Sequence, residues 1–166
     1  MNLLVERTCR FSPCRTYRYE LRVIWDNTRK PQCFIGLNPS VADEQNDDPT
    51  IRRCIDFAQR WGAGGIVMAN LFAYRATDPK VMLSYGGDPI GPENTIEHLQ
   101  GIAFGCLNRP IAAWGNNALR WRKGERVRVF RESGPLDCLR ITKDGNPEHP
   151  LYLPKTLTPI PWNYTT

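Results

Sequence analysis

The feature that most constrains the fold is a regular alternation of short apolar runs with longer amphipathic or polar segments from residue 31 to residue 142. Each run has the length of a strand buried in a sheet. The runs occupy residues 32–37, 65–69, 110–114 and 136–142. Because strands that alternate with helices pair in parallel, the sequence predicts an α/β fold, a three-layer α/β/α domain with a central, mostly parallel sheet.

The segments between these runs carry the helical period. Four apolar residues between Ile51 and Ala58 recur at helical spacing, and charged residues occupy the other side. Asp48 is a favourable N-cap and Pro49 suits the first helical position, so we expect a helix to begin there. We also expect helices within residues 92–106 and 117–132, and one helical turn near residues 80–84.

The N-terminal part adds a strand to this sheet. Residues 16–25 alternate aromatic and β-branched side chains with charged ones, and a turn-forming segment separates them from the run at 32–37. This pattern predicts an antiparallel hairpin whose N-terminal strand lies at a sheet edge. The Pro-rich tail, residues 154–166, has no periodicity, so we expect a single domain over 1–166 with a core over about 17–153.

The composition favours a soluble protein that binds a polyanion. Hydrophobic residues make up 41% and charged residues 23%, and no window of about 18 apolar residues offers a membrane span. We therefore expect a cytoplasmic protein without membrane contact. The net charge of +5 is built from 17 Arg and 5 Lys, and the planar guanidinium suits phosphate. The six cysteines follow no zinc spacing, so we expect reduced, structural thiols and no metal site.

Polar side chains follow each predicted strand of the parallel sheet. Asn38 and Ser40 come after the first, Asn70 after the second, Asn116 after the third, and His149 follows the last at some distance. Because parallel strands end at one side of a sheet, these residues predict a polar pocket there. The alternative is that they are ordinary turn residues, which any loop after a strand collects.

Known catalytic motifs are absent from these strand ends. No Gly-rich phosphate fingerprint, G-x-S-x-G elbow or H-E-x-x-H helix is present, so we expect no nucleotide cofactor and no serine hydrolase. His149 stands between Pro147 and Pro150, which hold it stiffly enough to aim a proton or a positive charge. It could equally be a capping or packing residue.

Several motifs match a known family in order. The stretches "FIGLNPSVADEQNDDPTIRRC", "DPIGPEN", "AAWGNNA" and "TKDGNPEHPLYL" resemble the DUF1643 family of small bacterial and phage proteins over about residues 17–153. More distantly, "IGLNPS", "IVMANLFAYRA" and "HPLYL" are similar to motifs of the uracil-DNA glycosylase superfamily, particularly its mismatch-specific branch. This resemblance implies a uracil-DNA glycosylase-like fold and a DNA glycosylase that acts on an unusual or modified base in DNA.

The resemblance also implies residue roles. Asn38 would orient the water that attacks the sugar C1′, Asn70 would bind the flipped base, and His149 would stabilise charge on the departing base. Ser40 stands where the mismatch-specific branch has Gly, and Leu-Tyr-Leu replaces a small Ser-containing loop. The other residues assigned to the substrate are Pro39, Ser40, Phe72, Asn116 and Tyr152, and those assigned to DNA phosphates are Arg52, Arg53, Arg75 and Lys143.

Two other functions stay open from the sequence. The chain could be a nucleotide- or nucleic-acid-binding module that has the fold without the chemistry. Alternatively, it could be a metal-dependent hydrolase in which Asp43, Asp47, Asp48 and His149 converge on one cation. The Arg-rich segment 120–131 could follow a phosphate backbone or simply form a solvated helix face.

Overall fold

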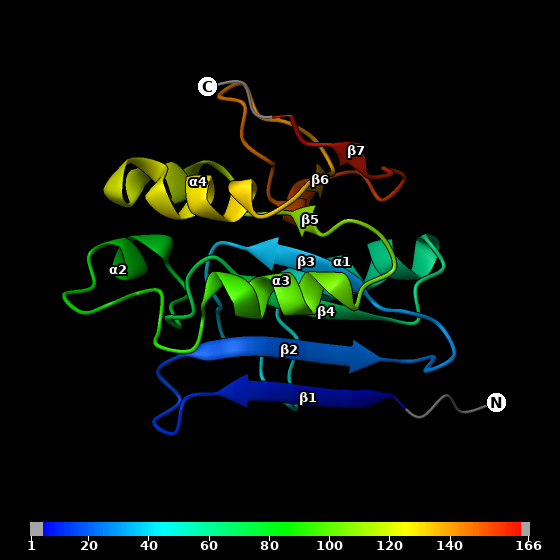
Figure 1. The fold of residues 1–166 in the computed structure, drawn as a ribbon. Helices are drawn as coiled ribbons and strands as arrows, with labels where there is room; N and C mark the ends of the chain where they lie inside the picture. Colours follow the sequence, from blue (N-terminus) through cyan, green and yellow to red (C-terminus); the bar gives the residue numbers. More distant parts are fainter. Residues whose placement is uncertain (1–4, 164–166) are drawn as a thin grey trace.

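Seven strands form one mixed sheet in a computed structural model that describes residues 5–163 (Figure 1). The strands are β1 (Glu6–Phe11), β2 (Arg18–Ile24), β3 (Gln32–Gly36), β4 (Gly65–Asn70), β5 (Ile111–Ala112), β6 (Asp137–Cys138) and β7 (Ile160–Pro161). The helices are α1 (Pro49–Arg60), α2 (Pro79–Leu83), α3 (Ile96–Phe104) and α4 (Glu125–Glu132), with 3-10 turns η1 (Asn116–Arg120), η2 (Arg122–Gly124) and η3 (Pro150–Tyr152).

The spatial order of the strands is β1-β2-β4-β3-β5-β6-β7. The four central strands, β4, β3, β5 and β6, pair in parallel, while β1, β2 and β7 are antiparallel to their neighbours. The predicted α/β class with a parallel centre is therefore confirmed. Because the carboxyl ends of the parallel strands lie on one side, their loops meet there.

Two apolar clusters cover the two faces of the sheet. Along β3, Cys33 and Ile35 belong to one cluster and Phe34 to the other, as the alternation of a strand requires. The face of Phe34 packs against α1 through Ile51, Cys54, Phe57 and Ala58. The opposite face packs against α3 and α4 through Leu99, Ile102, Val127 and Phe130. The helices thus form layers on both sides, with α3 in front of the sheet in Figure 1.

Helix α1 begins where the sequence predicts. Pro49 is its first residue, and the Asp48 side chain accepts a hydrogen bond of 2.8 Å from the Ile51 backbone N–H. In contrast, the helix predicted over 117–132 is only partly confirmed. The chain there forms η1, η2 and α4 and breaks at Gly124, whose φ of +77° lies in the left-handed region.

The predicted N-terminal hairpin is wrong. β2 does not pair with β3 but with β4, through Leu21↔Met68 and Val23↔Ile66, so it lies inside the sheet. The antiparallel edge strand is β1, which the sequence analysis did not identify. The charged residues of β2 suggested an edge strand. They alternate with buried residues such as Leu21 and Val23, however, and a strand with this alternation can also lie between two neighbouring strands.

The tail also belongs to the fold. β7 pairs with β6, and the buried Trp162 packs edge-on against Trp114 with 5.1 Å between ring centroids. The core therefore extends beyond the predicted residues 17–153. Four of the six cysteines are buried, as expected of structural thiols, whereas Cys9 is half-buried and Cys14 is exposed. Among the described residues, no helix has the length and apolar character needed to cross a membrane.

Candidate functional site

A cavity of about 450 Å³ lies at the carboxyl ends of β3, β4 and β5, on the sheet face that α1 covers. Its wall includes the first turn of α1 and the loop before η3. The predicted residues in the wall are Asn38, Pro39, Ser40, Asn70, Asn116 and His149. The structure thus brings together the three residues on which the predicted chemistry depends. A volume of this size is typical of small-molecule sites.

Asn38 is fixed by its amide nitrogen. Its Nδ2 donates to the backbone oxygen of Ala76 at 2.8 Å, with longer contacts to the oxygens of Pro39 and Tyr74 at 3.2 and 3.4 Å. Only the NH2 group can donate to carbonyl oxygens, so these contacts settle the orientation of the amide. The Asn38 Oδ1 accepts no hydrogen bond from the described residues and is available to a ligand or water.

Asn70 lies in the same cavity wall as Asn38 and has an unpaired side chain. The residue is 2% exposed, and its Nδ2 is buried without a hydrogen-bond partner among the described residues. Gly36 pairs with Asn70 across the parallel ladder, and a Cβ on Gly36 would lie 2.6 Å from the Asn70 Oδ1. The absence of a side chain at Gly36 therefore leaves the space in which the Asn70 carboxamide lies.

His149 enters the cavity wall from the loop before η3. Its Nδ1 accepts a hydrogen bond of 3.3 Å from the Leu151 backbone N–H, so it caps this turn as well as lining the cavity. Desolvation lowers the pKa of His149, although the Asp48 carboxylate acts in the opposite direction. A neutral ring whose Nδ1 accepts must carry its proton on Nε2, where it can be donated.

Asn116 has a supporting role. Its Oδ1 accepts hydrogen bonds from Thr142 Oγ1 at 2.8 Å and from Asn146 Nδ2 at 3.0 Å. These contacts join the loop after β5 to the loop that leads to His149. Asn116 therefore holds a second loop of the cavity wall in place, and its amide nitrogen stays available.

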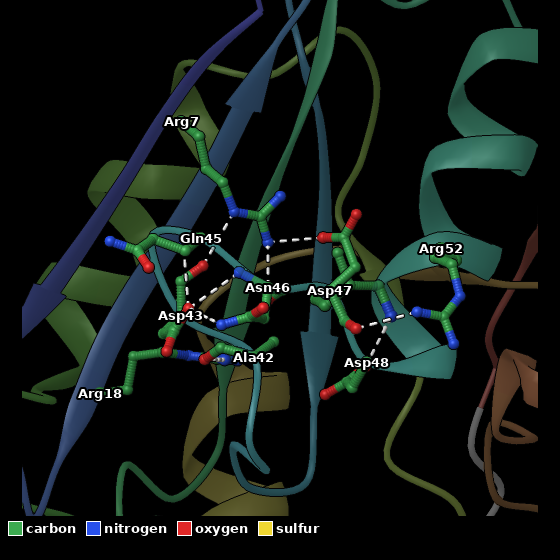
Figure 2. Close-up of polar contacts among 10 residues, drawn as sticks. Arg7, Arg18, Ala42, Asp43, Gln45, Asn46, Asp47, Asp48 and Arg52 are labelled. Atoms are coloured by element: carbon green, nitrogen blue, oxygen red, sulfur yellow. Dashed lines mark hydrogen bonds and ion pairs between the residues drawn. The ribbon is translucent and has the colours of Figure 1, made fainter.

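The acidic segment 42–48 is folded by its own hydrogen bonds and by arginines (Figure 2). The Asp43 carboxylate accepts from the backbone N–H groups of Gln45 and Asn46, each at 2.8 Å. Arg7 on β1 donates to the Asp43 backbone oxygen at 2.8 Å and pairs with the Asp47 carboxylate at 2.5 Å. The Asp43 and Asp47 carboxylates are therefore both bound by other groups of the protein.

The proposed metal ligands do not converge. Asp43 and Asp47 bind the loop and Arg7, whereas Asp48 caps α1 and lines the cavity near His149. Within residues 5–163, no group of three or more His, Cys, Asp or Glu side chains is arranged to hold a metal ion. This geometry gives no support to the metal-dependent hydrolase.

Six predicted site residues lie outside the cavity wall, and four of them also lie outside the smaller hollow next to it. Phe72 is fully buried and packs edge-on against Trp121, and Tyr152 is 88% exposed on η3. Arg75 stacks over the Phe11 ring, and Lys143 is exposed in a turn. The sequence was misleading for Phe72 because this residue comes two positions after Asn70, beyond the end of β4. There its side chain belongs to the apolar cluster on the sheet face opposite the cavity.

Arg52 and Arg53 line a smaller hollow next to the cavity. This hollow of about 260 Å³ also contains Lys155 and shares Pro49 and Leu151 with the cavity wall. Arg52 Nη1 donates to the Asp47 backbone oxygen at 2.9 Å, and Arg53 Nε donates to the Leu151 oxygen at 3.2 Å. Neither arginine pairs with an acidic side chain among the described residues. The carboxylate that lines the hollow, Asp56, pairs with Lys155 at 3.7 Å, so it does not neutralise the charge of the two arginines.

Sequence reasoning missed Arg18, which lines the cavity from β2. Arg10 pairs with Glu20 and Phe11 with Arg18, so Tyr19 is an extra residue in a β-bulge. Regular alternation would place Arg18 on the face of Glu20, but the bulge turns it to the other face, where it meets the cavity. No local sequence signal marks such a bulge, because it depends on the register with β1.

The comparisons with known proteins identify a family. The family described as "Protein of unknown function (DUF1643)" matches residues 18–151. No curated protein and no solved structure matches the chain. Since the match covers most of the sequence, the chain belongs to the DUF1643 family.

Proposed function

We propose that the protein is a DNA glycosylase-like enzyme that hydrolyses the N-glycosidic bond of an unusual or modified base in DNA. The observation that carries the proposal is the shared cavity, in which Asn38 and Asn70 present unused polar atoms beside His149. A uracil-DNA glycosylase-like fold belongs to the same proposal, supported by the motifs at Asn38, Asn70 and His149 and by the parallel centre of the sheet.

The cavity suits a reaction that depends on positioning. N-glycosidic cleavage passes through a cation-like sugar, so it needs an oriented water and stabilisation of the departing base. Asn38 Oδ1 can accept a hydrogen bond from that water, and the rigid anchoring of its Nδ2 lowers the entropy cost of holding it. The C1′–N bond breaks with its electron pair on the base, the water oxygen binds C1′, and a water proton reaches the base through solvent.

Asn70 and His149 would act on the base. The Asn70 carboxamide has a donor and an acceptor free to pair with a base edge, and this pairing would satisfy the buried Nδ2. The His149 ring, neutral with its proton on Nε2, can donate to an oxygen that becomes negative as the base leaves. Beside the cavity, Arg52 and Arg53 would contact backbone phosphates.

A direct test is release of bases from DNA. The protein is incubated with oligonucleotides carrying a panel of modified bases and with phage DNA, and abasic sites are revealed by hot alkali. We expect release that withstands a chelator and disappears in Asn38→Ala. The matched control is Asn108→Ala, because Asn108 is exposed and lines a different hollow. Equal loss in both variants, or no release from any substrate, would refute the proposal.

One observation favours a second candidate, a binding module without hydrolysis. Asp48 is the only carboxylate among the described residues that line the cavity, and one of its oxygens caps α1. Because an asparagine amide cannot take a proton at neutral pH, the cavity is poor in proton acceptors. The same experiment separates the two functions, since a module binds its target DNA or nucleotide and releases no base.

A further inference from the structure

Arg18 is a buried cation in the cavity wall with unused hydrogen-bond donors. The residue is 2% exposed, and its Nη1 donates to the Ala42 backbone oxygen at 2.7 Å. Its Nε is buried without a hydrogen-bond partner, and no carboxylate among the described residues forms an ion pair with it. A guanidinium has five N–H groups, so one contact to Ala42 uses a small part of its capacity.

This arrangement is costly in the free protein. Burial lowers the pKa of Arg18 to about 10, so the side chain is still charged at neutral pH. The Asp48 carboxylate in the same cavity wall attracts it electrostatically without forming an ion pair, whereas Arg7 and Arg75 repel it. Buried charges are ordinarily paired, because an unpaired one loses hydration without compensation. The missing partner of Arg18 can be supplied by a ligand.

The surroundings of Arg18 also favour a ligand. Asn70 lines the same cavity and its buried Nδ2 is also unpaired, so two buried groups there lack acceptors. The first turn of α1 contributes Pro49 and Thr50 to the wall, and the partial positive charge of a helix N-terminus favours an anion. The Asp48 carboxylate would repel an anion, so the negative group of a ligand would lie on the Arg18 side of the cavity.

We propose that the ligand of this cavity carries a carboxylate or phosphate group that pairs with Arg18. The inference rests on the proposed function, because it names the substrate class of the same cavity. The shared chemistry is a planar or tetrahedral oxyanion matched to the guanidinium fork. It can come from an acidic substituent on a base in DNA or from the phosphate of a free nucleotide.

Affinity measurements with paired probes test the inference. Calorimetric titration compares uracil with 5-carboxyuracil, and uridine with uridine monophosphate, so that each pair differs by one anionic group. We expect the acidic member of at least one pair to bind roughly 10- to 100-fold more tightly than its neutral partner, the range for a hydrogen bond to a charged group. A preference in the first pair points to an acidic base, and one in the second pair to a nucleotide phosphate.

Two arginine variants separate binding from loop support. Arg18→Met should abolish the preference for the acidic probe. Arg7→Met is the matched control, because Arg7 also holds the 42–48 segment, through Asp43, Asn46 and Asp47, but does not line the cavity (Figure 2). If Arg18→Met does not fold, Arg18→Lys decides, since it keeps the charge and loses the fork, and it should weaken the preference severalfold.

Three results would overturn the inference. They are the absence of a preference in both pairs, an unchanged preference in the Arg18 variant, and an equal loss in Arg7→Met. The outcome is independent of base release. If neutral bases are released and the acidic probes are not preferred, the proposed function stands and this inference falls. If the acidic probes are preferred and no base is released from any substrate, this inference stands and the proposed hydrolysis falls.

Discussion

The substitution Gly36→Ala tests the geometry of the cavity with one methyl group. A Cβ at Gly36 would lie 2.6 Å from the Asn70 Oδ1 and 2.8 Å from the Met68 Cε. β3 lies between β4 and β5, so its backbone cannot move away without disturbing two ladders. The flexible end of Met68 can yield, whereas the Asn70 carboxamide must leave its place over the strand. We therefore expect the substitution to displace Asn70 rather than to unfold the protein.

The magnitude follows from two opposing effects. Overpacking a well-packed site costs about 1–3 kcal/mol, while replacing Gly by Ala stabilises by about 0.4–1 kcal/mol through the unfolded chain. The free energy of unfolding should fall by about 1–2 kcal/mol, which corresponds to about 3–6 °C in Tm for a chain of this size. Base release, or ligand affinity if the protein is a module, should fall at least about tenfold, because the displaced carboxamide loses a hydrogen bond to the ligand.

The assay is a double-mutant cycle between Gly36→Ala and Asn70→Ala, measured by urea denaturation and by base release. Removing the Asn70 side chain removes the clash, so Gly36→Ala should cost clearly less in that background. Gly101→Ala is the control, because a Cβ there meets open space and the residue lies inside α3, where Ala adds about 1 kcal/mol of stability. Additive effects of the two cavity substitutions would refute this reasoning.

Four further outcomes are expected. Asn38→Ala should lower the free energy of unfolding by about 1–3 kcal/mol, since the Ala76 carbonyl loses its donor, and Asn38→Asp should be no better at neutral pH because a carboxylate cannot donate; full stability of either variant in urea would contradict the anchoring. The lowered pKa of His149 means that the unfolded chain binds its proton at higher pH than the folded protein, so this contribution to stability is present above pH 6.5 and is lost as pH falls through the folded pKa. When pH is lowered from about 8 to about 5, Tm should fall less in His149→Asn than in the unsubstituted protein. An equal fall in both proteins would show that His149 does not cause the pH dependence. Arg126→Met should cost about 1–3 kcal/mol in urea, because the buried guanidinium donates to the Asn94 and Leu71 oxygens behind β4; an unchanged midpoint would show that relief of its buried charge offsets the lost bonds. Excess chelator should leave base release unchanged, since the acidic side chains of the 42–48 segment already bind protein groups, and loss that returns with added metal would reverse this expectation.

The central sheet could be predicted because its signals are local. A buried parallel strand needs a short apolar run, and α1 needs an apolar stripe, an N-cap at Asp48 and a proline at its first position. These requirements are met within a few residues of the chain. The edges could not be predicted in this way, because β1 and β7 are short or alternating segments that become strands only where a neighbour offers a ladder.

The same division holds for the site. The common position of Asn38, Asn70 and His149 in one cavity wall could be predicted, because parallel strands bring their carboxyl ends to one side, whatever the details of the loops. The position of Phe72 and Tyr152 outside the cavity wall could not be predicted from a motif, since the turn after a strand decides to which side the next side chains point. The acidic segment was ambiguous for a related reason, because only the folded loop shows that the Asp43 carboxylate binds backbone N–H groups and that the Asp47 carboxylate pairs with Arg7.

The order of the parallel strands, the start of helix α1 and the polar residues that follow each parallel strand could be predicted from the sequence alone. Tertiary structure alone decided the pairing of β2 with β4, the space over Gly36 and the direction of Arg18. Periodicity and capping act over a few residues, whereas register, bulges and close approach depend on which distant strand lies alongside. Arg18, the charge on which the proposed choice of ligand depends, is therefore a residue that the sequence pattern did not indicate.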